Sequence, residues 1–141
     1  STGDVITPRA IEYQYSFILE NRTATLLSYN LETVLAEKLQ TILVRELVNT
    51  RMRDFYDIHV LLTLYEKSID VSVLKDAFKA TCKKRNTLDL ISYSKQAVER
   101  IRSSNALSNL WIDYQNKYVY AQDISYKDAV NSVEKLLDKL S

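Results

Sequence analysis

The chain has 141 residues, of which 46% are hydrophobic and 26% charged, a balance typical of one folded domain and not of a disordered chain. Its nineteen basic and eighteen acidic residues give a formal net charge of +1, which excludes an overall field that would attract nucleic acid. The single cysteine excludes an internal disulfide, and no apolar run is long enough to cross a membrane. We therefore expect a cytoplasmic protein that does not contact a membrane.

The N-terminal part of the sequence predicts a small β-structure. Residues 1–4 indicate a turn and include no initiator methionine, which predicts that the chain is a fragment of a longer protein. Apolar and polar side chains alternate over residues 10–18, as in a half-buried strand. Residues 20–22 then favour a turn and residues 23–27 a second strand. We expect residues 1–29 to form a β-hairpin that ends a truncated sheet.

The rest of the chain predicts helices. Its only glycine and only proline are Gly3 and Pro8, so everything after them lacks the two strongest helix breakers. The apolar period predicts helices at about residues 30–48, 51–67, 71–84, 93–102, 105–120 and 125–140. Their candidate N-caps are Asn30, the pair Asn49–Thr50, Asp70, Ser92, Asn105 and Ser125. The sequence thus predicts an α+β fold that is mainly α, in which the N-terminal β-hairpin precedes a bundle of about six helices, the helical domain of residues 30–141.

The first predicted helix places two cations on an apolar face. Winding it at about 100° per residue gathers on that face Leu31, Val34, Leu35, Leu39 and Ile42. Lys38 and Arg45 are seven residues apart, so they stack on one line, and that line lies inside the apolar face. Because an unpaired buried cation is costly, each of them needs an anionic partner or a water-filled cleft.

The second predicted helix supplies anionic partners. Asp54 lies on its apolar stripe, and Asp57 lies one turn further along at the edge of that stripe. The connection between the two helices is only a couple of residues long, so their apolar faces should meet in a helical hairpin. One polar cluster would then contain Lys38, Arg45, Arg51, Arg53, Asp54 and Asp57.

Spacing alone leaves two interpretations of this cluster open. It is either a salt-bridge network that fixes the packing of the two helices or a functional site, since both arrangements perturb charges in the same way. Two carboxylates and four cations are more than helix register requires, which favours the functional interpretation slightly.

The order of these residues resembles a known family. The C-terminal motif of the AbiEii/AbiGii toxins is similar to residues 31–39 (LETVLAEKL), then Arg45, then residues 49–57 (NTRMRDFYD). The similarity is dense from Ser28 to Leu62 and includes the spacing of lysine, arginine, arginine–aspartate and aspartate. These toxins have a nucleotidyltransferase fold and belong to abortive-infection toxin–antitoxin systems.

The resemblance implies transfer of a nucleotide from a nucleoside triphosphate (NTP) to an acceptor, which is tRNA in some relatives, with Mg²⁺ as the cofactor. Carried over by position, the catalytic residues are Lys38, Asp54 and Asp57. The nucleotide-binding residues carried over in the same way are Lys38, Arg45, Arg51 and Arg53. A lysine point charge and an arginine fork both suit phosphate oxygens.

One departure from the family concerns the metal site. Its Gly-Ser motif and metal-binding acidic pair belong to an N-terminal region, and nothing in this chain matches them. We therefore expect a C-terminal fragment whose residues 1–29 end a truncated nucleotidyltransferase sheet, and which binds neither Mg²⁺ nor NTP and is inactive alone. The alternative is a non-catalytic helical module that binds a partner protein such as an antitoxin.

Several other features favour structural roles. His59, the only histidine, and Cys82 are expected to pack and not to react. A solvated helix face, with contact to an RNA backbone as the functional alternative, is predicted for Lys75, Lys79, Lys83, Lys84 and Arg85. A stripe that favours core packing over base stacking is formed by Leu107, Leu110, Trp111, Tyr114 and Tyr118.

Overall fold

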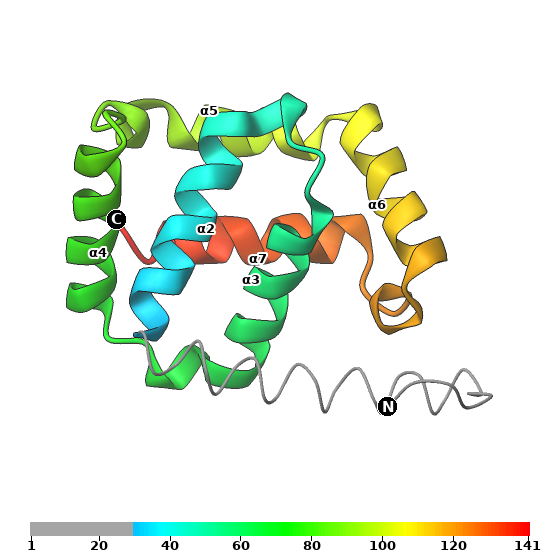
Figure 1. Cartoon of the computed structure of the whole chain (residues 1–141), viewed down its shortest axis with the longest axis horizontal. Coiled ribbons are helices and arrows are strands. Elements are labelled where there is room, and N and C mark those ends of the chain that lie inside the picture. Colours follow the sequence, from blue (N-terminus) through cyan, green and yellow to red (C-terminus); the bar gives the residue numbers. More distant parts are fainter. Residues whose placement is uncertain (1–29) are drawn as a thin grey trace.

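The computed structural model describes residues 30–141, which form six α-helices joined by short connections (Figure 1). The α-helices are α2 (Leu31–Arg45), α3 (Met52–Tyr65), α4 (Val71–Lys84), α5 (Leu90–Arg102), α6 (Asn105–Lys117) and α7 (Tyr126–Asp138). Single 3-10 turns follow three of them: η1 (Glu46–Val48), η2 (Glu66–Ser68) and η3 (Val119–Ala121).

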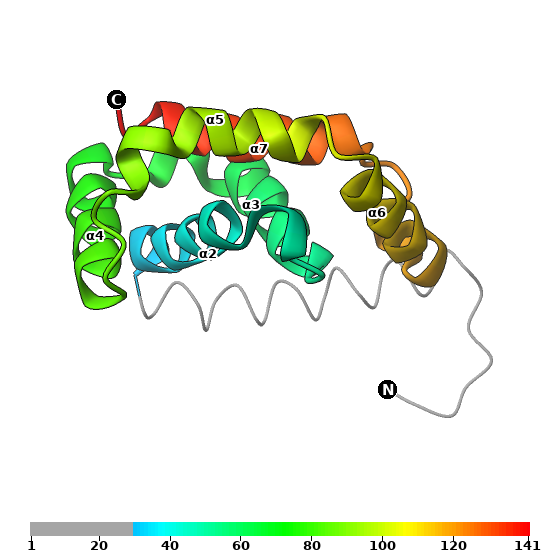
Figure 2. The ribbon, with the colours of Figure 1, turned by 90° about the horizontal axis from the view of Figure 1, so that it is seen from above.

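The helices pack in two layers with a helix at either end. Helix α2 contacts α3, α4 and α5, while α7 contacts α3 and α5. Seen from above, α5 and α7 run over α2 and α3, with α4 at one end and α6 at the other (Figure 2). The core between the layers is apolar, and its largest fully buried side chains include Trp111, Phe55, Phe78, Leu39 and Ile58. None of the helices within residues 30–141 is long and apolar enough to cross a membrane.

The predicted α+β class is wrong for the part of the chain that the structure describes. Residues 30–141 contain helices and turns and no strand. The β-content of the prediction came from the hairpin expected within residues 10–27, which lies outside the described residues. The bundle of six helices is confirmed, because an apolar period of 3.6 residues without glycine or proline leaves no segment that would bury its apolar side as a strand.

Three of the predicted N-caps are confirmed. The side chains that accept a backbone N–H of the first turn belong to Asn30, Asp70 and Ser125. Ser125 forms a capping box, because its Oγ accepts the Asp128 N–H at 3.0 Å and an Asp128 carboxylate oxygen accepts the Ser125 N–H at 3.4 Å. The start of α7 is therefore fixed by local hydrogen bonds.

The other predicted N-caps are wrong. Arg51 precedes α3 without a side-chain cap, while the side-chain oxygen of Asn49 accepts the Arg51 N–H outside the helix. Helix α5 begins at Leu90, before Ser92, whose Oγ donates to the Asp89 carbonyl oxygen at 2.6 Å inside the first turn. Because Leu90 is buried in the core, the helix begins at this residue, two residues before the predicted cap. Helix α6 is capped by Ser104, whose extended backbone lets its Oγ accept the Leu107 N–H at 3.1 Å. Asn105 is the first residue inside that helix.

The connection from α2 to α3 is a tight turn held by side chains. Glu46 has a φ of 44° and a ψ of −118°, a conformation that is costly for a residue with a Cβ atom. Arg100 of α5 holds Glu46 by donating to both carboxylate oxygens, at 2.6 and 3.0 Å. Asn49, which is fully buried, accepts the Arg51 N–H with its side-chain oxygen at 3.0 Å. These contacts fix the backbone on either side of Arg45 and Arg51.

Candidate functional site

One lysine joins two buried carboxylates across the α2–α3 hairpin. Lys38 Nζ lies 3.3 Å from Asp54 Oδ1 and 3.0 Å from Asp57 Oδ2. The Lys38 side chain is 16% exposed, and those of Asp54 and Asp57 are 7% and 3% exposed. The predicted contact of Lys38 with these aspartates is therefore confirmed, since the lysine reaches both of them.

The ammonium group of Lys38 keeps donor capacity beyond this pair. It carries three N–H donors, of which two serve the carboxylates. Within the described part of the chain the third donor has no protein partner. Because Lys38 also lines the adjacent pocket, this donor is available to a group inside it.

That pocket lies between α2, α3 and the turn that follows α4, and has a volume of about 640 Å³. We call it the α2–α3 pocket. Its charged lining residues are Glu37, Lys38, Arg45, Arg51, Asp54 and Arg85. Four cations and two carboxylates leave an excess of two positive charges around the hollow. A pocket of this charge favours an anionic ligand.

The two arginines predicted at the site and found in the pocket differ in their contacts. Arg51 is exposed, and its Nε lies 4.0 Å from Asp54 Oδ2, at the limit of an ion pair. Arg45 is exposed too, and its guanidinium makes no ion pair or hydrogen bond within residues 30–141. Arg45 therefore presents five unused donors beside the lysine.

Sequence reasoning did not place Arg85 in this pocket. Helix α4 ends in a Schellman turn, in which the Thr87 N–H bonds to the Cys82 carbonyl oxygen at 2.7 Å and Asn86 takes a φ of 58°. The turn directs Arg85 towards α2, where it donates to Gln40 Oε1 and, at 3.1 Å, to Thr41 Oγ1. The available signal was Asn86, because asparagine tolerates the left-handed conformation that ends a helix.

Asp57 and Arg53 lie on the other side of the cluster, outside the lining of the α2–α3 pocket. Both act on Tyr114 of α6, whose pKa is raised well above its usual value. Burial is the main cause of that shift, followed by the hydrogen bond to Tyr120, and the charges of Asp57 and Arg53 then act in opposite directions. The polar cluster thus adjoins the pocket on one side and a group of tyrosines on the other.

The amino-acid sequence was compared with models of known protein families. The sequence matches the family described as "Nucleotidyl transferase AbiEii toxin, Type IV TA system" over residues 1–139. The chain belongs to the AbiEii family. The match covers both helices that carry the polar cluster, and the resemblance noted from the sequence is confirmed. No curated protein and no solved structure matches the chain.

The Mg²⁺ of nucleotidyl transfer does not fit the described residues of this AbiEii chain. Within residues 30–141, no three His, Cys, Asp or Glu side chains come together as metal ligands. The two buried carboxylates of the cluster, Asp54 and Asp57, are engaged by Lys38. A hard cation that needs several oxygen ligands has no such set among these residues.

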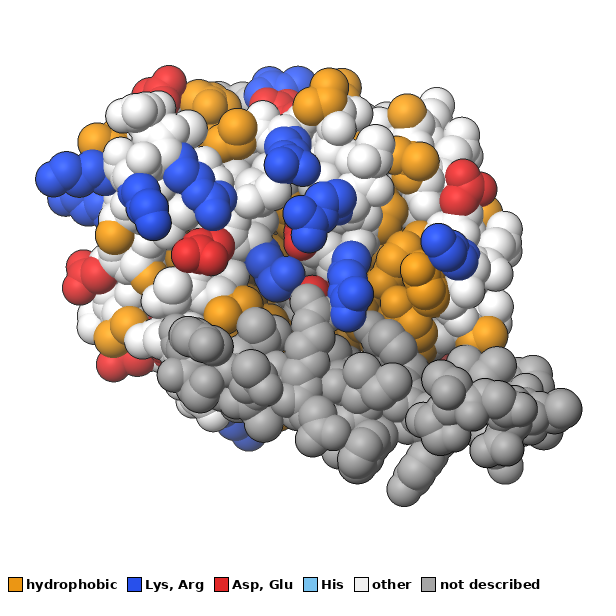
Figure 3. Space-filling view, viewed as in Figure 1, with side chains coloured by type: hydrophobic (Ala, Val, Ile, Leu, Met, Phe, Trp, Pro, Cys, Tyr) orange, Lys and Arg blue, Asp and Glu red, His pale blue; other side chains and the backbone are white. Residues whose placement is uncertain are grey.

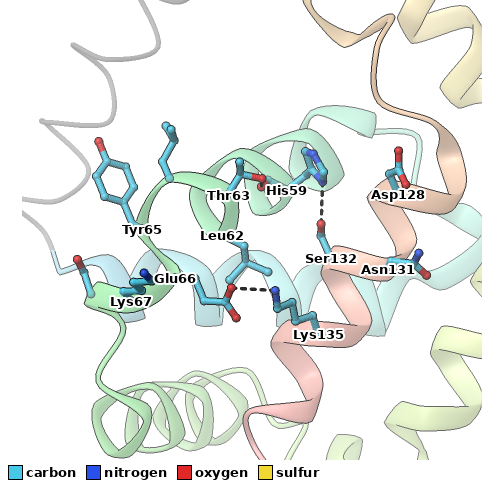
Figure 4. A pocket seen from close by; sticks show the side chains of 12 residues that line it. His59, Leu62, Thr63, Tyr65, Glu66, Lys67, Asp128, Asn131, Ser132 and Lys135 are labelled. Atoms are coloured by element: carbon cyan, nitrogen blue, oxygen red, sulfur yellow. Dashed lines mark hydrogen bonds and ion pairs between the residues drawn. The ribbon is translucent and has the colours of Figure 1, made fainter.

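A second pocket, of about 550 Å³, lies where α3 and η2 face α7 (Figure 4). His59 and Ser132 point towards one another across it, with His59 Nδ1 2.7 Å from Ser132 Oγ. Burial lowers the pKa of His59, partly opposed by the charge and a backbone hydrogen bond of Asp128. Lys135 and Lys139 both hold Glu66, at 2.8 and 2.9 Å.

The cysteine, the basic residues of α4 and the histidine have the structural roles expected from the sequence. Cys82 is fully buried, and burial raises the pKa of its thiol, so the cysteine packs in the core. The basic residues of α4 at four-residue spacing are all exposed: Lys75, Lys79 and Lys83. His59 is half-buried and hydrogen-bonded.

Proposed function

In place of the expectation that this chain binds no NTP, we propose that the α2–α3 pocket binds the triphosphate of an NTP. We also propose that this AbiEii toxin transfers the nucleotidyl group to an acceptor hydroxyl, for which the family resemblance suggests tRNA. The observation that carries the proposal is the donor supply of the pocket. Lys38 and Arg45 both present N–H donors without a protein partner among the described residues, in a lining with two excess positive charges. Phosphate oxygens are the acceptors that suit such donors.

The proposed reaction is a displacement at the α-phosphorus. The oxygen of the acceptor hydroxyl attacks this phosphorus, and the bond to the oxygen that bridges to the β-phosphate breaks. Pyrophosphate leaves with the bonding electron pair, and the hydroxyl proton passes to solvent water. Negative charge grows on the leaving pyrophosphate, so cations fixed beside it lower the barrier. In the proposal Lys38 and Arg45 face the β- and γ-phosphates, with Arg51 at the rim.

Asp54 and Asp57 position Lys38 in this proposal. A lysine side chain has four rotatable bonds and would otherwise sample many positions. Two buried carboxylates hold its nitrogen at 3.3 and 3.0 Å. The ammonium is therefore oriented before substrate arrives, which is how a preorganised site avoids reorganisation during the reaction.

A salt-bridge network that only fastens the hairpin accounts for less of the geometry. It explains why Lys38 pairs with Asp54 and Asp57, but it does not require exposed guanidiniums around the same hollow. Arg45 contributes nothing to such a network, because its guanidinium has no partner within residues 30–141. Its place in the lining favours a ligand.

Titration of the protein with NTP, nucleoside diphosphate and nucleoside tests the proposal. We expect affinity to fall in that order and with rising salt, because the phosphates make the contacts. Arg45→Gln should weaken NTP binding about 10-fold or more, the loss that follows removal of one charge-assisted hydrogen bond. Lys79→Gln removes an exposed cation of α4 outside the pocket and is the matched control.

Two results would count against the proposal. One is a nucleoside that binds as tightly as its triphosphate, which would place the contacts on the base or sugar. The other is an equal effect of Arg45→Gln and Lys79→Gln, which would show that general surface charge, and not the α2–α3 pocket, attracts the ligand.

A further inference from the structure

Three tyrosine rings meet on the surface beside the polar cluster. Tyr114 and Tyr118 lie one turn apart at the end of α6, and η3 brings Tyr120 back against them. Their ring centroids are 4.8, 5.2 and 6.0 Å apart. All three side chains are half-buried, so part of each ring faces solvent. We call this group the tyrosine platform.

Beneath the platform lie Trp111 and Gln115 of α6, whose side chains hydrogen-bond to the loop that follows this helix. Trp111 is fully buried, stacks 5.4 Å from Tyr114, and donates its indole N–H to the Ile124 carbonyl oxygen at 2.8 Å. Gln115 donates to the carbonyl oxygens of Ala121, at 3.2 Å, and Ile124, at 2.8 Å. The loop that carries the third ring is thereby tied to α6 and keeps the rings in place.

Cations flank the platform. Lys117 Nζ lies 5.4 Å from the ring centroid of Tyr118, within the range of a cation–π contact. Arg53 is exposed on α3, and its charge acts on Tyr114. In Figure 3, hydrophobic-type side chains gather between the regions of α3 and α6, with Lys or Arg side chains on both sides. Within the described part of the chain neither Arg53 nor Lys117 is paired with a carboxylate.

Aromatic rings bordered by cations are what proteins use to bind unpaired nucleic acid. Bases stack on the rings, and the cations meet the backbone phosphates. A protein partner would more often meet an aromatic patch whose exposed charges are mixed. Here the buried Asp57 also acts on Tyr114, but the exposed side chains named beside the rings, Arg53 and Lys117, are both positive. Asp57 joins this surface to the α2–α3 pocket, because it pairs with Lys38 and also acts on Tyr114.

We infer that the tyrosine platform binds the unpaired end of a nucleic-acid acceptor and holds it beside the nucleotide pocket. This inference rests on the proposed function, since it assigns the second substrate of the same reaction. Tyr118 stacks on a base and Lys117 and Arg53 contact the phosphates on either side of it. The platform therefore sets a preference for single strands over duplexes, because paired bases keep their faces inside the helix.

Fluorescence anisotropy of labelled oligonucleotides tests this assignment. The probes are a single-stranded RNA of about ten nucleotides, within the site sizes of single-strand-binding proteins, the DNA of the same sequence, and a blunt duplex of that RNA. We expect both single strands to bind more tightly than the duplex. Tyr118→Leu should weaken single-strand binding about 5- to 100-fold, the loss expected for one stacked base.

Matched variants separate stacking from folding. Tyr118→Phe keeps the ring and should bind like the parent protein, while Tyr93→Leu changes a half-buried tyrosine of α5 and should leave binding unchanged. Circular dichroism and melting of each variant show whether it is folded. Equal binding by Tyr118→Leu and parent, or a duplex that binds as tightly as the single strand, would overturn the inference.

The inference about the platform and the proposal about the pocket can be refuted independently by these variants. Tyr118→Leu should leave NTP affinity unchanged, and Arg45→Gln should leave single-strand affinity within about twofold when the phosphate contacts are made elsewhere. NTP binding with Tyr118-insensitive oligonucleotide binding would overturn the platform alone. Dimerisation that Tyr118→Leu abolishes, with no oligonucleotide bound, would assign the surface to a second copy and also overturn it.

Discussion

Lys38 occupies a position that hydrophobic periodicity assigns to the core of the bundle, and its surroundings explain how a cation is tolerated there. Two carboxylates lie within 3.3 Å of its nitrogen, and its third donor faces a pocket. The pairing could be predicted from sequence because both partners lie on one short helical hairpin. The position of Arg85 in the pocket could not be predicted from sequence, since this residue follows a separate helix in a turn whose direction depends on tertiary packing.

Removal of the Lys38 charge should lower the free energy of unfolding, because two carboxylates are buried beside it. Lys38→Met removes the cation that Asp54 and Asp57 share, so we expect it to lower the free energy of unfolding by about 3–5 kcal/mol. Adding Asp54→Asn and Asp57→Asn removes the two buried negative charges and should restore most of that loss. Urea unfolding at neutral pH measures both changes.

The matched control is Lys79→Met, an exposed lysine of α4, which should change stability by no more than about 0.5 kcal/mol. If Lys38→Met unfolds at the same urea concentration as the parent protein, the carboxylates do not depend on the lysine and the cluster is not coupled as described.

The half-buried histidine predicts a pH dependence. Burial lowers the pKa of His59 below its ordinary value of 6.5, so the unfolded chain binds a proton more readily than the folded one. Stability from this residue is fully present above 6.5 and is lost as pH falls below that value towards the folded pKa. His59→Gln should therefore flatten the stability profile between about pH 8 and about pH 5.

Unfolding by urea across this pH range checks the assignment. Parallel profiles of parent and His59→Gln, displaced by a constant free energy, would show that another group is responsible for the acid dependence. Ser132→Ala removes the hydroxyl partner of Nδ1 without removing the imidazole, so it should keep a pH-dependent profile.

At the scale of the helices, the sequence predicted which helices exist and in what order, but it predicted their first and last residues less well. Helices α2 and α3 were predictable from long apolar stripes and the short turn between them. The start of α5 was not, because the burial of Leu90 outweighed the capping preference of Ser92. Ser92 instead lies inside the first turn, where its Oγ donates to the Asp89 carbonyl oxygen, and where the helix starts depends on what it packs against.

The capping box of α7 gives a test at this scale. Ser125→Ala removes the hydroxyl that accepts the Asp128 N–H, and we expect a loss of about 1 kcal/mol in unfolding free energy. Ser103→Ala is the control, since Ser103 is exposed and its side chain makes no hydrogen bond within residues 30–141. Equal midpoints for these two variants in thermal unfolding would argue that α7 is fixed by packing on α3 and α5 alone.

At the scale of the molecule, the bundle brings two surfaces to one face. Helix α2 and the end of α4 shape the α2–α3 pocket, while α6 and η3 carry the tyrosine platform. Helix α3 contributes Asp54 to the pocket and Arg53 beside the platform. The net charge of +1 excluded only an overall attractive field, because it averages over a surface whose cations are gathered locally (Figure 3). Helical periodicity predicted core positions for Tyr114 and Tyr118, and the return of η3 beside them was not visible in that pattern.

The central claim is that the Lys38 cluster acts on NTP and does more than fasten two helices. Its most direct test is the rate of nucleotide transfer by the protein carrying Lys38→Met with Asp54→Asn and Asp57→Asn, measured beside its melting temperature. We expect near-parental melting with transfer reduced at least about 100-fold, the effect of losing one preorganised donor at a developing charge. Parental melting together with a parental transfer rate would contradict it.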